Sequence, residues 1–311
     1  MTIKRAIITG CTGTIGHALI DELIGHGIEI FALCNPVSKR VMTLPQNPLL
    51  HIIPIDLADL VQSAGKMPKD CDVFYHFGWN GTWGSARNDT EQQEKNISYT
   101  LDAVELAHEC GCHTFVGAGS QAEYGRCDDI LHADTPCFPE NGYGIAKLCA
   151  GQMSRIKTQS YGMKHIWARV VSAYGPYDGE YTMIISAIRK LLAGEKMSFT
   201  KGEQLWDYIY SKDLGRMMFE LASEKSRDGK VYLLCRGDSR PLSEYITVMR
   251  DCIDPGLPLG FGEIPYADKQ VMRLCADSSD IVNDLHFEYQ YTFERGIMET
   301  IEWCRNNPVA K

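Results

Sequence analysis

The chain has 311 residues and a net charge of −9 at pH 7, with 44% hydrophobic residues, which is enough for one large domain or two ordinary ones. Without a basic tract, this charge argues against nucleic acid or an anionic membrane as the main partner. The 12 cysteines include no Cys-x-x-Cys pair, and Cys110-x-Cys112 lacks companion ligands at zinc-like spacing, so we expect no metal site.

No apolar run reaches the length of a membrane span, and residues 1–5 lead directly into a strand-like segment at residues 6–9. We therefore expect neither a transmembrane helix nor a signal peptide. Together with the unpaired cysteines, this predicts a cytoplasmic protein whose partner is a small molecule.

The first predicted strand, residues 4–9, leads into a glycine-rich turn and then an amphipathic helix that ends near residue 25. Strand, glycine turn and helix in this order are the context that a dinucleotide fingerprint requires. Gly10 permits the tight turn, Gly13 lets a pyrophosphate approach the backbone, and Gly16 lets the helix pack closely on the strand. The alternative is a glycine turn without a ligand. The residues expected to contact the cofactor here are Gly10, Thr12, Gly13, Thr14, Ile15 and Gly16.

The second predicted strand, residues 29–34, ends without the acidic residue that usually binds a free ribose 2′-hydroxyl. Asn35 follows directly, and Ser38, Lys39 and Arg40 come shortly after it. A serine and two basic residues suit a 2′-phosphate, so the sequence favours NADP(H), with NAD(H) as the alternative. A basic turn exposed to solvent would give the same pattern without any cofactor contact.

The third predicted strand, residues 49–54, is followed by Asp56 and Leu57. At this place an acidic side chain can accept a hydrogen bond from the adenine amino group of a dinucleotide. The alternative is that Asp56 caps the amino end of a helix. We treat both residues as candidate cofactor contacts.

The fourth predicted strand, residues 72–76, runs into Phe77, Gly78 and a loop rich in tryptophan and glycine. Parallel sheets bind ligands beyond the carboxyl ends of their strands. We therefore expect Phe77 and Gly78 to contact the cofactor. The loop adds three candidate substrate contacts, although aromatic side chains at this place can also close the core. These candidates are Trp79, Trp83 and Arg87.

Residues 89–110 form a predicted helix, and the fifth predicted strand begins at residue 113 and ends at Ser120. In the next predicted helix, residues 143–162, Tyr143 and Lys147 are four positions apart and so lie on one face. An ammonium near a phenol favours phenolate, which makes Tyr143 a usable proton donor or acceptor near neutral pH. The Ser120 hydroxyl would bind the same substrate oxygen. A tyrosine and a lysine on the surface of an amphipathic helix would show the same spacing without catalysis.

A sixth predicted strand, residues 164–171, completes an alternation of strands and helices that specifies an α/β fold with a doubly wound, Rossmann-like parallel sheet. The alternation ends after residue 176. We expect a cofactor-binding domain of residues 1–172 plus about 206–236. A smaller α+β substrate-binding lobe would comprise about 173–205 plus 237–311. The later predicted elements are helices at 182–193, 213–224, 242–253 and 293–306 and a strand at 230–235.

In the order of its motifs, the chain resembles the extended short-chain dehydrogenase/reductase superfamily, in particular its NAD(P)-dependent nucleotide-sugar epimerases, dehydratases and ketoreductases. The resemblance covers nearly the whole length. It rests on the glycine turn, on Ser120, on the Tyr143-x-x-x-Lys147 pair, and on late segments at residues 174–176, 207–213 and 293–303.

The resemblance implies roles for these residues. Tyr143 would exchange a proton with a sugar oxygen while a hydride moves to or from the nicotinamide. Lys147 would lower the pKa of Tyr143 and bind the nicotinamide ribose, and Ser120 would orient the carbonyl. Asn96 would support the active-site helix, unless it is simply a helix-surface residue. The further cofactor contacts implied are Asn96, Tyr143, Lys147, Val170 and Val171.

One departure from the family pattern concerns the reaction. Dehydratases carry an Asp-Glu pair directly after the active-site serine or threonine, whereas Gln121 and Ala122 stand here and Glu123 would have to point elsewhere. This argues against a 4,6-dehydratase. It favours an NADPH-dependent reductase of a nucleotide-linked 4-keto-6-deoxy sugar. The alternatives are a nucleotide-sugar 4-epimerase with bound NAD and an NADP(H)-binding sensor without turnover.

A second departure concerns the substrate. Trp206 stands where relatives often place an arginine that grips the diphosphate. Arg273 could replace that arginine through a bidentate phosphate contact, with Arg189 and Lys190 as weaker candidates. If none of them does, the substrate would carry no diphosphate. The full set of candidate substrate contacts is Trp79, Trp83, Arg87, Gln121, Ser172, Trp206 and Arg273.

The family often dimerises through the two long helices predicted here at residues 89–110 and 143–162. Leu101, Val104 and Met153 are expected on the outer faces of these helices. The sequence is therefore compatible with a homodimer.

Overall fold

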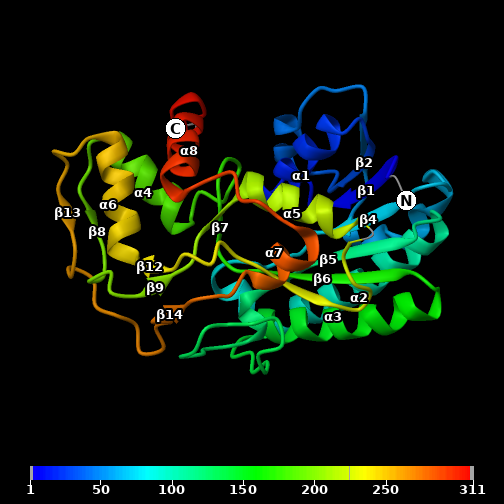
Figure 1. Cartoon of the computed structure of the whole chain (residues 1–311). Helices are drawn as coiled ribbons and strands as arrows, with labels where there is room; N and C mark the ends of the chain where they lie inside the picture. The colour runs from blue at the N-terminus through cyan, green and yellow to red at the C-terminus, as the bar shows by residue number, and fades with distance from the viewer. Residues whose placement is uncertain (1–2, 224, 309–311) are drawn as a thin grey trace.

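The computed structural model describes residues 3–223 and 225–308, and its centre is a seven-stranded sheet (Figure 1). The strands follow the order β11-β6-β5-β4-β1-β2-β3. Each pairs in parallel with its neighbours, which confirms the predicted α/β fold with a doubly wound parallel sheet. The strands are β1 (Arg5–Thr9), β2 (Glu29–Cys34), β3 (Leu50–Pro54), β4 (Val73–His76), β5 (Thr114–Ser120), β6 (Lys164–Val170) and β11 (Val231–Leu234).

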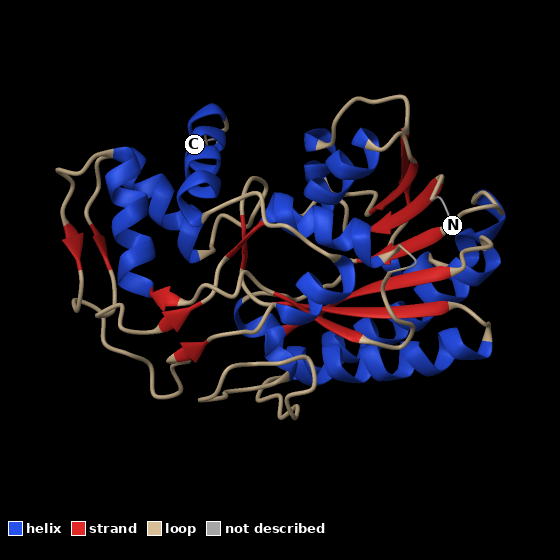
Figure 2. Cartoon of the chain, in the orientation of Figure 1, coloured by secondary structure: helices blue, strands red, loops and turns tan. Residues whose placement is uncertain are grey.

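The inner strands of the sheet are almost completely buried. All of β4 is buried, and so are the last six residues of β6. Figure 2 shows why, because helices cover both faces of the sheet. Strands buried on both faces appear in a sequence as continuous apolar runs. The predicted strands therefore match the observed ones to within a few residues at their ends.

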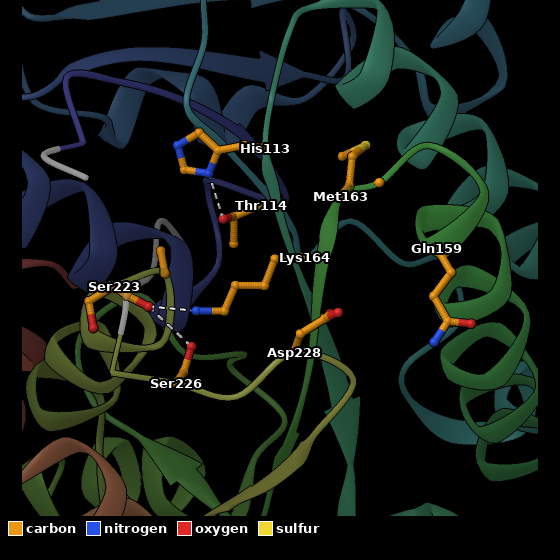
Figure 3. Close-up of a pocket in the computed structure, with 10 residues that line it drawn as sticks. His113, Thr114, Gln159, Met163, Lys164, Ser223, Ser226 and Asp228 are labelled. Carbon is orange, nitrogen blue, oxygen red and sulfur yellow. Dashed lines mark hydrogen bonds between the residues drawn. The ribbon is translucent and has the colours of Figure 1, made fainter.

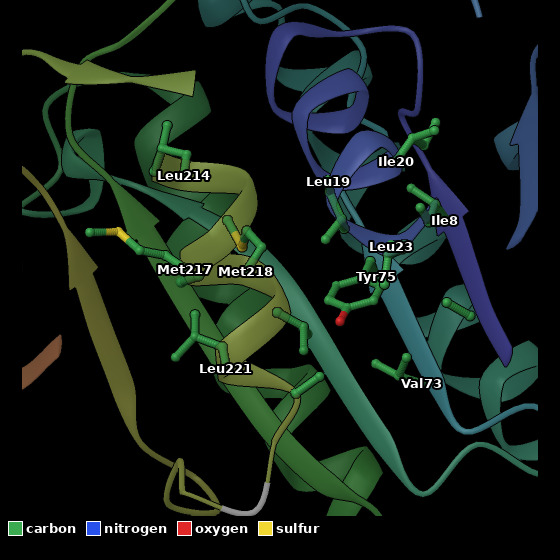
Figure 4. Packing of buried hydrophobic residues seen from close by; sticks show 14 of the residues in the cluster. Ile8, Leu19, Ile20, Leu23, Val73, Tyr75, Leu214, Met217, Met218 and Leu221 are labelled. Atoms are coloured by element: carbon green, nitrogen blue, oxygen red, sulfur yellow. The ribbon is translucent and has the colours of Figure 1, made fainter. Parts of the chain in front are cut away.

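Helices α1 (Thr14–Gly25) and α5 (Ser211–Leu221) pack against each other on one face of the sheet (Figure 4). Helix α5 was predicted at 213–224, and residue 224 lies outside the described residues. The contact is close, because a Cβ at Gly215 would lie 2.5 Å from the Ala18 carbonyl oxygen. Full burial of each large apolar side chain stabilises by roughly 1.5–3 kcal/mol. The fully buried side chains labelled in Figure 4 are Ile8, Leu19, Ile20, Leu23, Val73, Tyr75, Leu214, Met217, Met218 and Leu221.

Helices α2 (Thr90–Glu109) and α3 (Gly142–Ser160) pack together on the opposite face. Val104 was expected on an outer face, and this expectation is wrong, because Val104 is fully buried against the sheet with Phe74 and Phe115. Met153 is exposed as expected. The exposed apolar side chains of α3 are Ile145, Met153 and Ile156.

The second half of the chain builds a separate hydrophobic cluster, which includes Ile188, Tyr245, Met249 and Ile297. Its short strands form small sheets, with β9 paired to both β12 and β14. The helices are α4 (Met183–Leu192), α6 (Leu242–Ile253), α7 (Ser279–Leu285) and α8 (Phe293–Asn306). The strands are β7 (Ala173–Tyr174), β8 (Met197–Ser198), β9 (Leu205–Trp206), β10 (Ile209–Tyr210), β12 (Arg240–Pro241), β13 (Leu259–Gly260) and β14 (Arg273–Leu274).

Residues 3–223 and 225–308 contain neither a membrane-spanning helix nor a cluster of metal-ligating side chains. No helix in these ranges is long and apolar enough to cross a bilayer. In the same residues, no group of three or more His, Cys, Asp or Glu side chains is arranged to hold a metal ion.

Candidate active site

The candidate catalytic residues meet at the carboxyl end of β5. The 3-10 turn that follows, Gln121–Glu123, forms a capping box, in which the Ser120 hydroxyl accepts from the Ala122 N–H and the Glu123 carboxylate accepts from the Ser120 N–H. Helix α3 begins beside this turn, where the Asn141 side chain accepts from the Gly144 N–H at 2.8 Å. These two caps fix Ser120 and the first turns of α3 relative to each other.

Lys147 is buried under the loop that follows β4. Its Nζ donates to the Ala118 carbonyl oxygen at 2.7 Å and lies 3.7 Å from the centroid of a Trp79 ring. Burial lowers the pKa of Lys147 to about 7, while the Glu123 carboxylate opposes this shift. The side chain of Lys147 therefore exchanges between its charged and neutral forms near neutral pH.

Tyr143 lies between Ser120 and the loop. Burial raises the pKa of Tyr143, and the Ser120 hydroxyl and the Arg87 guanidinium oppose this rise. The Arg87 Cζ lies 4.3 Å from the centre of the Tyr143 ring, whereas Lys147 Nζ lies 5.9 Å from it. We expected a lowered Tyr143 pKa, but in this structure it is raised, because burial outweighs the effects of the Ser120 hydroxyl and the Arg87 guanidinium.

The glycine turn has the geometry of an anion site. Gly10 has φ +70°, and a Cβ there would lie 2.5 Å from the Phe77 carbonyl carbon. Gly13 stands at the N-cap of α1 without a side-chain cap, and the buried Thr14 Oγ1 has no hydrogen-bond partner. Unpaired donors at a helix N-terminus suit phosphate oxygens, so the residues fit a dinucleotide pyrophosphate.

Two cavities flank this turn and contain most of the predicted cofactor contacts. The smaller, of about 160 Å³, lies between the ends of β1, β2, β3 and β4. The larger, of about 390 Å³, lies over the start of α1. The smaller is lined by Gly10, Thr12, Asn35, Ser38, Asp56, Leu57, Gly78 and Trp79, among others. The larger is lined by Gly10, Gly13, Thr14, Ile15, Gly16, Arg40, Phe77 and Trp83, among others.

Several predicted cofactor contacts already have protein partners. Asp56 accepts from the Ala58 N–H at 3.0 Å and from the Asn35 amide at 2.6 Å, so it caps the short turn after β3 as well as lining the cavity. Arg40 donates to the Tyr177 carbonyl oxygen, and exposed Lys39 lines neither cavity.

Asn96 is buried, so its interpretation as a helix-surface residue is wrong. Its amide binds both the N–H and the carbonyl oxygen of Asn80. It therefore holds the loop after β4, and its support of the active-site helix stays a prediction. The predicted contacts Val170 and Val171 are buried at the end of β6, beside Ser120 in the sheet.

The predicted substrate contacts fall into two groups. Trp79 and Arg87 lie against Tyr143, and Gln121 follows Ser120 directly. Farther out, Trp206 donates to the Ser172 hydroxyl at 2.9 Å, and Arg273 lies in β14, the strand that pairs with Trp206 in β9. The Arg273 Nε is buried without a hydrogen-bond partner.

Arg189 does not belong to this group. It pairs with Glu180 at 3.1 Å and donates to the Cys304 carbonyl oxygen at 2.6 Å. Its guanidinium is therefore committed within the second half of the chain, and Arg273 is the better placed candidate for a phosphate contact.

A model described as the NAD dependent epimerase/dehydratase family matches residues 6–235. The chain belongs to this family. This confirms the resemblance drawn from the motifs, and it makes a nicotinamide dinucleotide the cofactor class. Several similar proteins are named for nucleotide sugars, namely UDP-glucose and dTDP-glucose.

Two curated relatives illustrate the range within the epimerase/dehydratase family. The chain is 25% identical to an uncharacterized UDP-glucose epimerase of Bacillus subtilis, over 96% of this chain and 97% of that protein. It is 27% identical to a dTDP-glucose 4,6-dehydratase of Escherichia coli, over 97% of this chain and 94% of that enzyme.

Solved structures agree on the fold. UDP-glucose 4-epimerase of Thermotoga maritima superposes with a TM-score of 0.86 at 20% identity, over 97% of this chain and 99% of that one. A dTDP-glucose 4,6-dehydratase of Streptomyces venezuelae with bound NAD gives 0.84 at 20% identity, over 97% of each chain.

The sequence did not predict that residues 177–182 form one wall of the larger cavity. Tyr177 has φ +63° and stacks on His17 with ring centres 3.6 Å apart, and Tyr181 stacks on Trp83 at 4.6 Å. The segment 177–182 thus crosses the cavity over the glycine turn. The only local signal was the preceding segment at residues 174–176, which says nothing about where the next residues lie.

A third cavity, of about 570 Å³, lies at the amino ends of the strands, opposite the candidate active site (Figure 3). His113, Thr114 and Lys164 line it at the amino ends of β5 and β6, and Lys164 donates to the Ser223 carbonyl oxygen at 2.6 Å. Since Ser120 lies at the other end of β5, this cavity is separate from the candidate active site.

Proposed function

We propose that this protein transfers a hydride between a nicotinamide cofactor and C4 of a nucleotide sugar, acting as an NADPH-dependent 4-ketoreductase on a 4-keto-6-deoxy sugar. The observation that carries the proposal is the convergence of Ser120, Tyr143 and Lys147 at the sheet edge that also holds the glycine turn. In this proposal, the cofactor-binding part and the substrate-binding part of the chain meet at that edge.

The proposed reaction assigns one task to each side chain. A bound nicotinamide would supply the hydride for the carbonyl carbon. Tyr143 gives its hydroxyl proton to the carbonyl oxygen, and Ser120 hydrogen-bonds that oxygen. Lys147, as an ammonium, stabilises the phenolate that Tyr143 becomes. Solvent then returns the proton to Tyr143.

The turn after Ser120 supports reduction over dehydration. Water elimination from the sugar needs an acid/base pair at this turn. Here Ala122 is buried and apolar, and Glu123 points away from the substrate side, with one carboxylate oxygen 2.6 Å from Arg169 Nε. Gln121 has no acidic proton to exchange. None of these three side chains can serve as the second acid or base.

The choice of NADPH is supported by Asn35 and Ser38, which line the smaller cavity where an acidic residue would face a free 2′-hydroxyl. Replacing Lys39 and Arg40 together by alanine is expected to weaken NADPH binding roughly 10- to 100-fold and NADH binding less, because only NADPH loses charged hydrogen bonds to a 2′-phosphate. Fluorescence titration with both cofactors measures this. Lys66→Ala is the control, and equal losses for both cofactors would contradict the assignment.

A 4-epimerase is the second candidate. The segment 177–182 is fastened across the cofactor cavity by Arg40, by His17 and by the Trp83–Tyr181 stack. An epimerase keeps its cofactor through the catalytic cycle, and such a strap favours slow cofactor release. Several similar proteins are named as 4-epimerases.

The deciding experiment uses purified protein, NADPH and a panel of dTDP-, CDP-, GDP- and UDP-linked 4-keto-6-deoxy sugars. Stoichiometric loss of nicotinamide absorbance with one nucleotide supports the ketoreductase. No loss, together with interconversion of 4-hydroxyl epimers in the stable nucleotide sugars, supports the epimerase. If neither reaction occurs while the cofactor still binds, the result rejects nucleotide-sugar chemistry and favours the cofactor sensor.

Arg273 tests whether the substrate carries a diphosphate. Arg273→Ala is expected to raise KM for the nucleotide sugar roughly 10- to 100-fold and to change kcat little, because a charged contact remote from C4 is lost. Steady-state kinetics of Arg126→Ala, which removes an exposed arginine paired with Glu140, provide the control. An unchanged KM would show that Arg273 does not bind the substrate.

We also propose that two copies associate through the exposed apolar face of α3, formed by Ile145, Met153 and Ile156. Sedimentation at several protein concentrations measures the state of association.

A further inference from the structure

The Glu123 side chain is fully buried behind Ser120, and both of its carboxylate oxygens accept hydrogen bonds. Its Oε1 accepts from the Ser120 N–H at 2.8 Å and from the Trp167 indole at 3.0 Å. Its Oε2 accepts from Arg169 Nε at 2.6 Å. One carboxylate therefore joins the end of β5 to two side chains of β6.

Arg169 is buried almost as completely, with 4% of its side chain exposed. Its guanidinium lies 4.5 Å from the centre of the Tyr124 ring, and its Nη1 donates to the Ala133 carbonyl oxygen at 3.2 Å. A buried ion pair of this kind is weak evidence for stability, since apolar residues of similar volume often replace one without loss. Its position beside the catalytic serine suggests a task in the reaction.

Glycines make room for this arrangement. A Cβ at Gly119 would lie 2.6 Å from Glu123 Oε1, and a Cβ at Gly151 of α3 would lie 2.6 Å from the Trp167 ring. Trp167 therefore contacts the catalytic helix on one side and the Glu123 carboxylate on the other. The ion pair and the helix that carries Tyr143 belong to one packed unit.

The charged and titratable groups around Glu123 and the catalytic pair come from four elements. Arg169 faces Glu123 from β6, while Tyr124 and Cys137 face it from the segment between β5 and α3, with their pKa values raised mainly by burial. Arg87 faces Tyr143 from the loop after β4. His76 faces Lys147 from β4, and burial together with Lys147 lowers the pKa of His76 to about 3, so that it is uncharged near neutral pH.

Among these described groups, Glu123 is the carboxylate that acts on both catalytic side chains. It raises the pKa of Lys147 against the effect of burial, and it adds to the rise in the pKa of Tyr143. Its negative charge favours the protonated form of both groups. Both are in their protonated forms when Tyr143 donates a proton.

We propose that the buried Glu123–Arg169 pair is a positioning unit for the reaction, which holds the Ser120 turn in place and sets a carboxylate behind the catalytic tyrosine and lysine. This inference rests on the proposed function, in which Tyr143 donates a proton during reduction. Arg169 holds the carboxylate in its inward-facing position. Glu123 acts through Ser120, Lys147 and Tyr143 without touching the substrate.

The test is Glu123→Gln, which keeps an oxygen for the Ser120 N–H but removes the charge. Loss of the charge lowers the pKa of Lys147 and of Tyr143, so both groups lose their protons at lower pH. The alkaline limb of the kcat profile is expected to move down by roughly one pH unit. KM for the nucleotide sugar is expected to stay within about 2-fold. Glu123→Asp, which keeps the charge, is expected to restore the position of the limb.

Controls separate charge from folding. Since Glu123→Gln leaves Arg169 buried without its partner, the double variant Glu123→Gln/Arg169→Gln removes both charges and is expected to show a smaller shift in the same direction. Glu140→Gln, which breaks the exposed pair with Arg126, leaves the profile unchanged. A uniform loss of activity at all pH values, with a lowered Tm, would show a merely structural role and overturn the proposal.

A second readout does not need a substrate. The Lys147 ammonium is followed by NMR of ¹⁵N-labelled lysine, with its signal assigned by Lys147→Met. If the titration midpoint of Lys147 lies at about 7 and is lower in Glu123→Gln, the positioning unit is supported. If this holds but no sugar is turned over, only the proposed reaction fails. An unmoved midpoint in both Gln variants overturns the inference whatever the activity.

Discussion

Tyr143→Phe is expected to reduce kcat about 10²- to 10⁴-fold while leaving cofactor affinity and thermal stability near those of the parent protein. The phenol proton has no substitute at this place, because Ser120 is a much weaker acid and Lys147 faces Trp79 and the Ala118 carbonyl oxygen. The remaining ring keeps its contacts with Trp79 and Arg87, so the site keeps its shape. Nicotinamide absorbance under saturating substrate measures the loss.

Tyr161→Phe is the matched control for this variant. Tyr161 lies at the other end of α3, where its hydroxyl donates to Glu105 at 2.6 Å, and its loss is expected to leave kcat unchanged. Unimpaired turnover in Tyr143→Phe would exclude Tyr143 as the proton donor. Unimpaired cellular function, without measurable turnover in the parent protein, would favour the cofactor sensor.

Gly16→Ala and Gly13→Ala are both expected to weaken cofactor binding, for different reasons. A Cβ at Gly16 would lie 2.6 Å from the Gly10 carbonyl oxygen, so α1 must move away from β1, at a cost of about 1–3 kcal/mol. A Cβ at Gly13 meets its nearest neighbour, the same oxygen, at an ordinary 3.6 Å. Gly16→Ala should therefore lower Tm, while Gly13→Ala should keep Tm and lose at least about 10-fold in cofactor affinity.

Thermal unfolding and cofactor titration of both variants separate the two effects. Gly25→Ala is the control, because a Cβ there meets no atom within 4 Å. Parent-like cofactor binding by Gly13→Ala would show that the pyrophosphate does not pass this glycine. An unchanged Tm in Gly16→Ala would show that α1 adjusts without strain.

Local patterns sufficed for the sheet and for the residues gathered at its edge. Each strand is a short apolar run, and Gly10 and Gly16 encode the turn because only glycine tolerates the positive φ of Gly10 and the close contacts at both positions. The spacing of Tyr143 and Lys147 follows from the helical repeat alone. Such features depend on residues that are close together in the chain, which is why sequence reasoning identifies them.

Features that depend on distant segments were not predictable in the same way. Nothing near Val104 distinguishes a helix face turned to the sheet from one turned to solvent. The partner of Arg40 is Tyr177, far away in the sequence. The pKa of Tyr143 reflects how deeply α3 is buried by the loop after β4, which a spacing of four residues cannot express.

The contact between Trp79 and Lys147 gives the protein a built-in optical signal. The charge on an ammonium 3.7 Å from an indole ring perturbs the excited state of that ring, so the emission of Trp79 depends on the protonation of Lys147. Of the five tryptophans, Trp79 lies against both catalytic side chains. Steady-state fluorescence of the unlabelled protein, recorded against pH or on adding ligand, therefore reports on the chemical state of the catalytic centre without any substrate being converted.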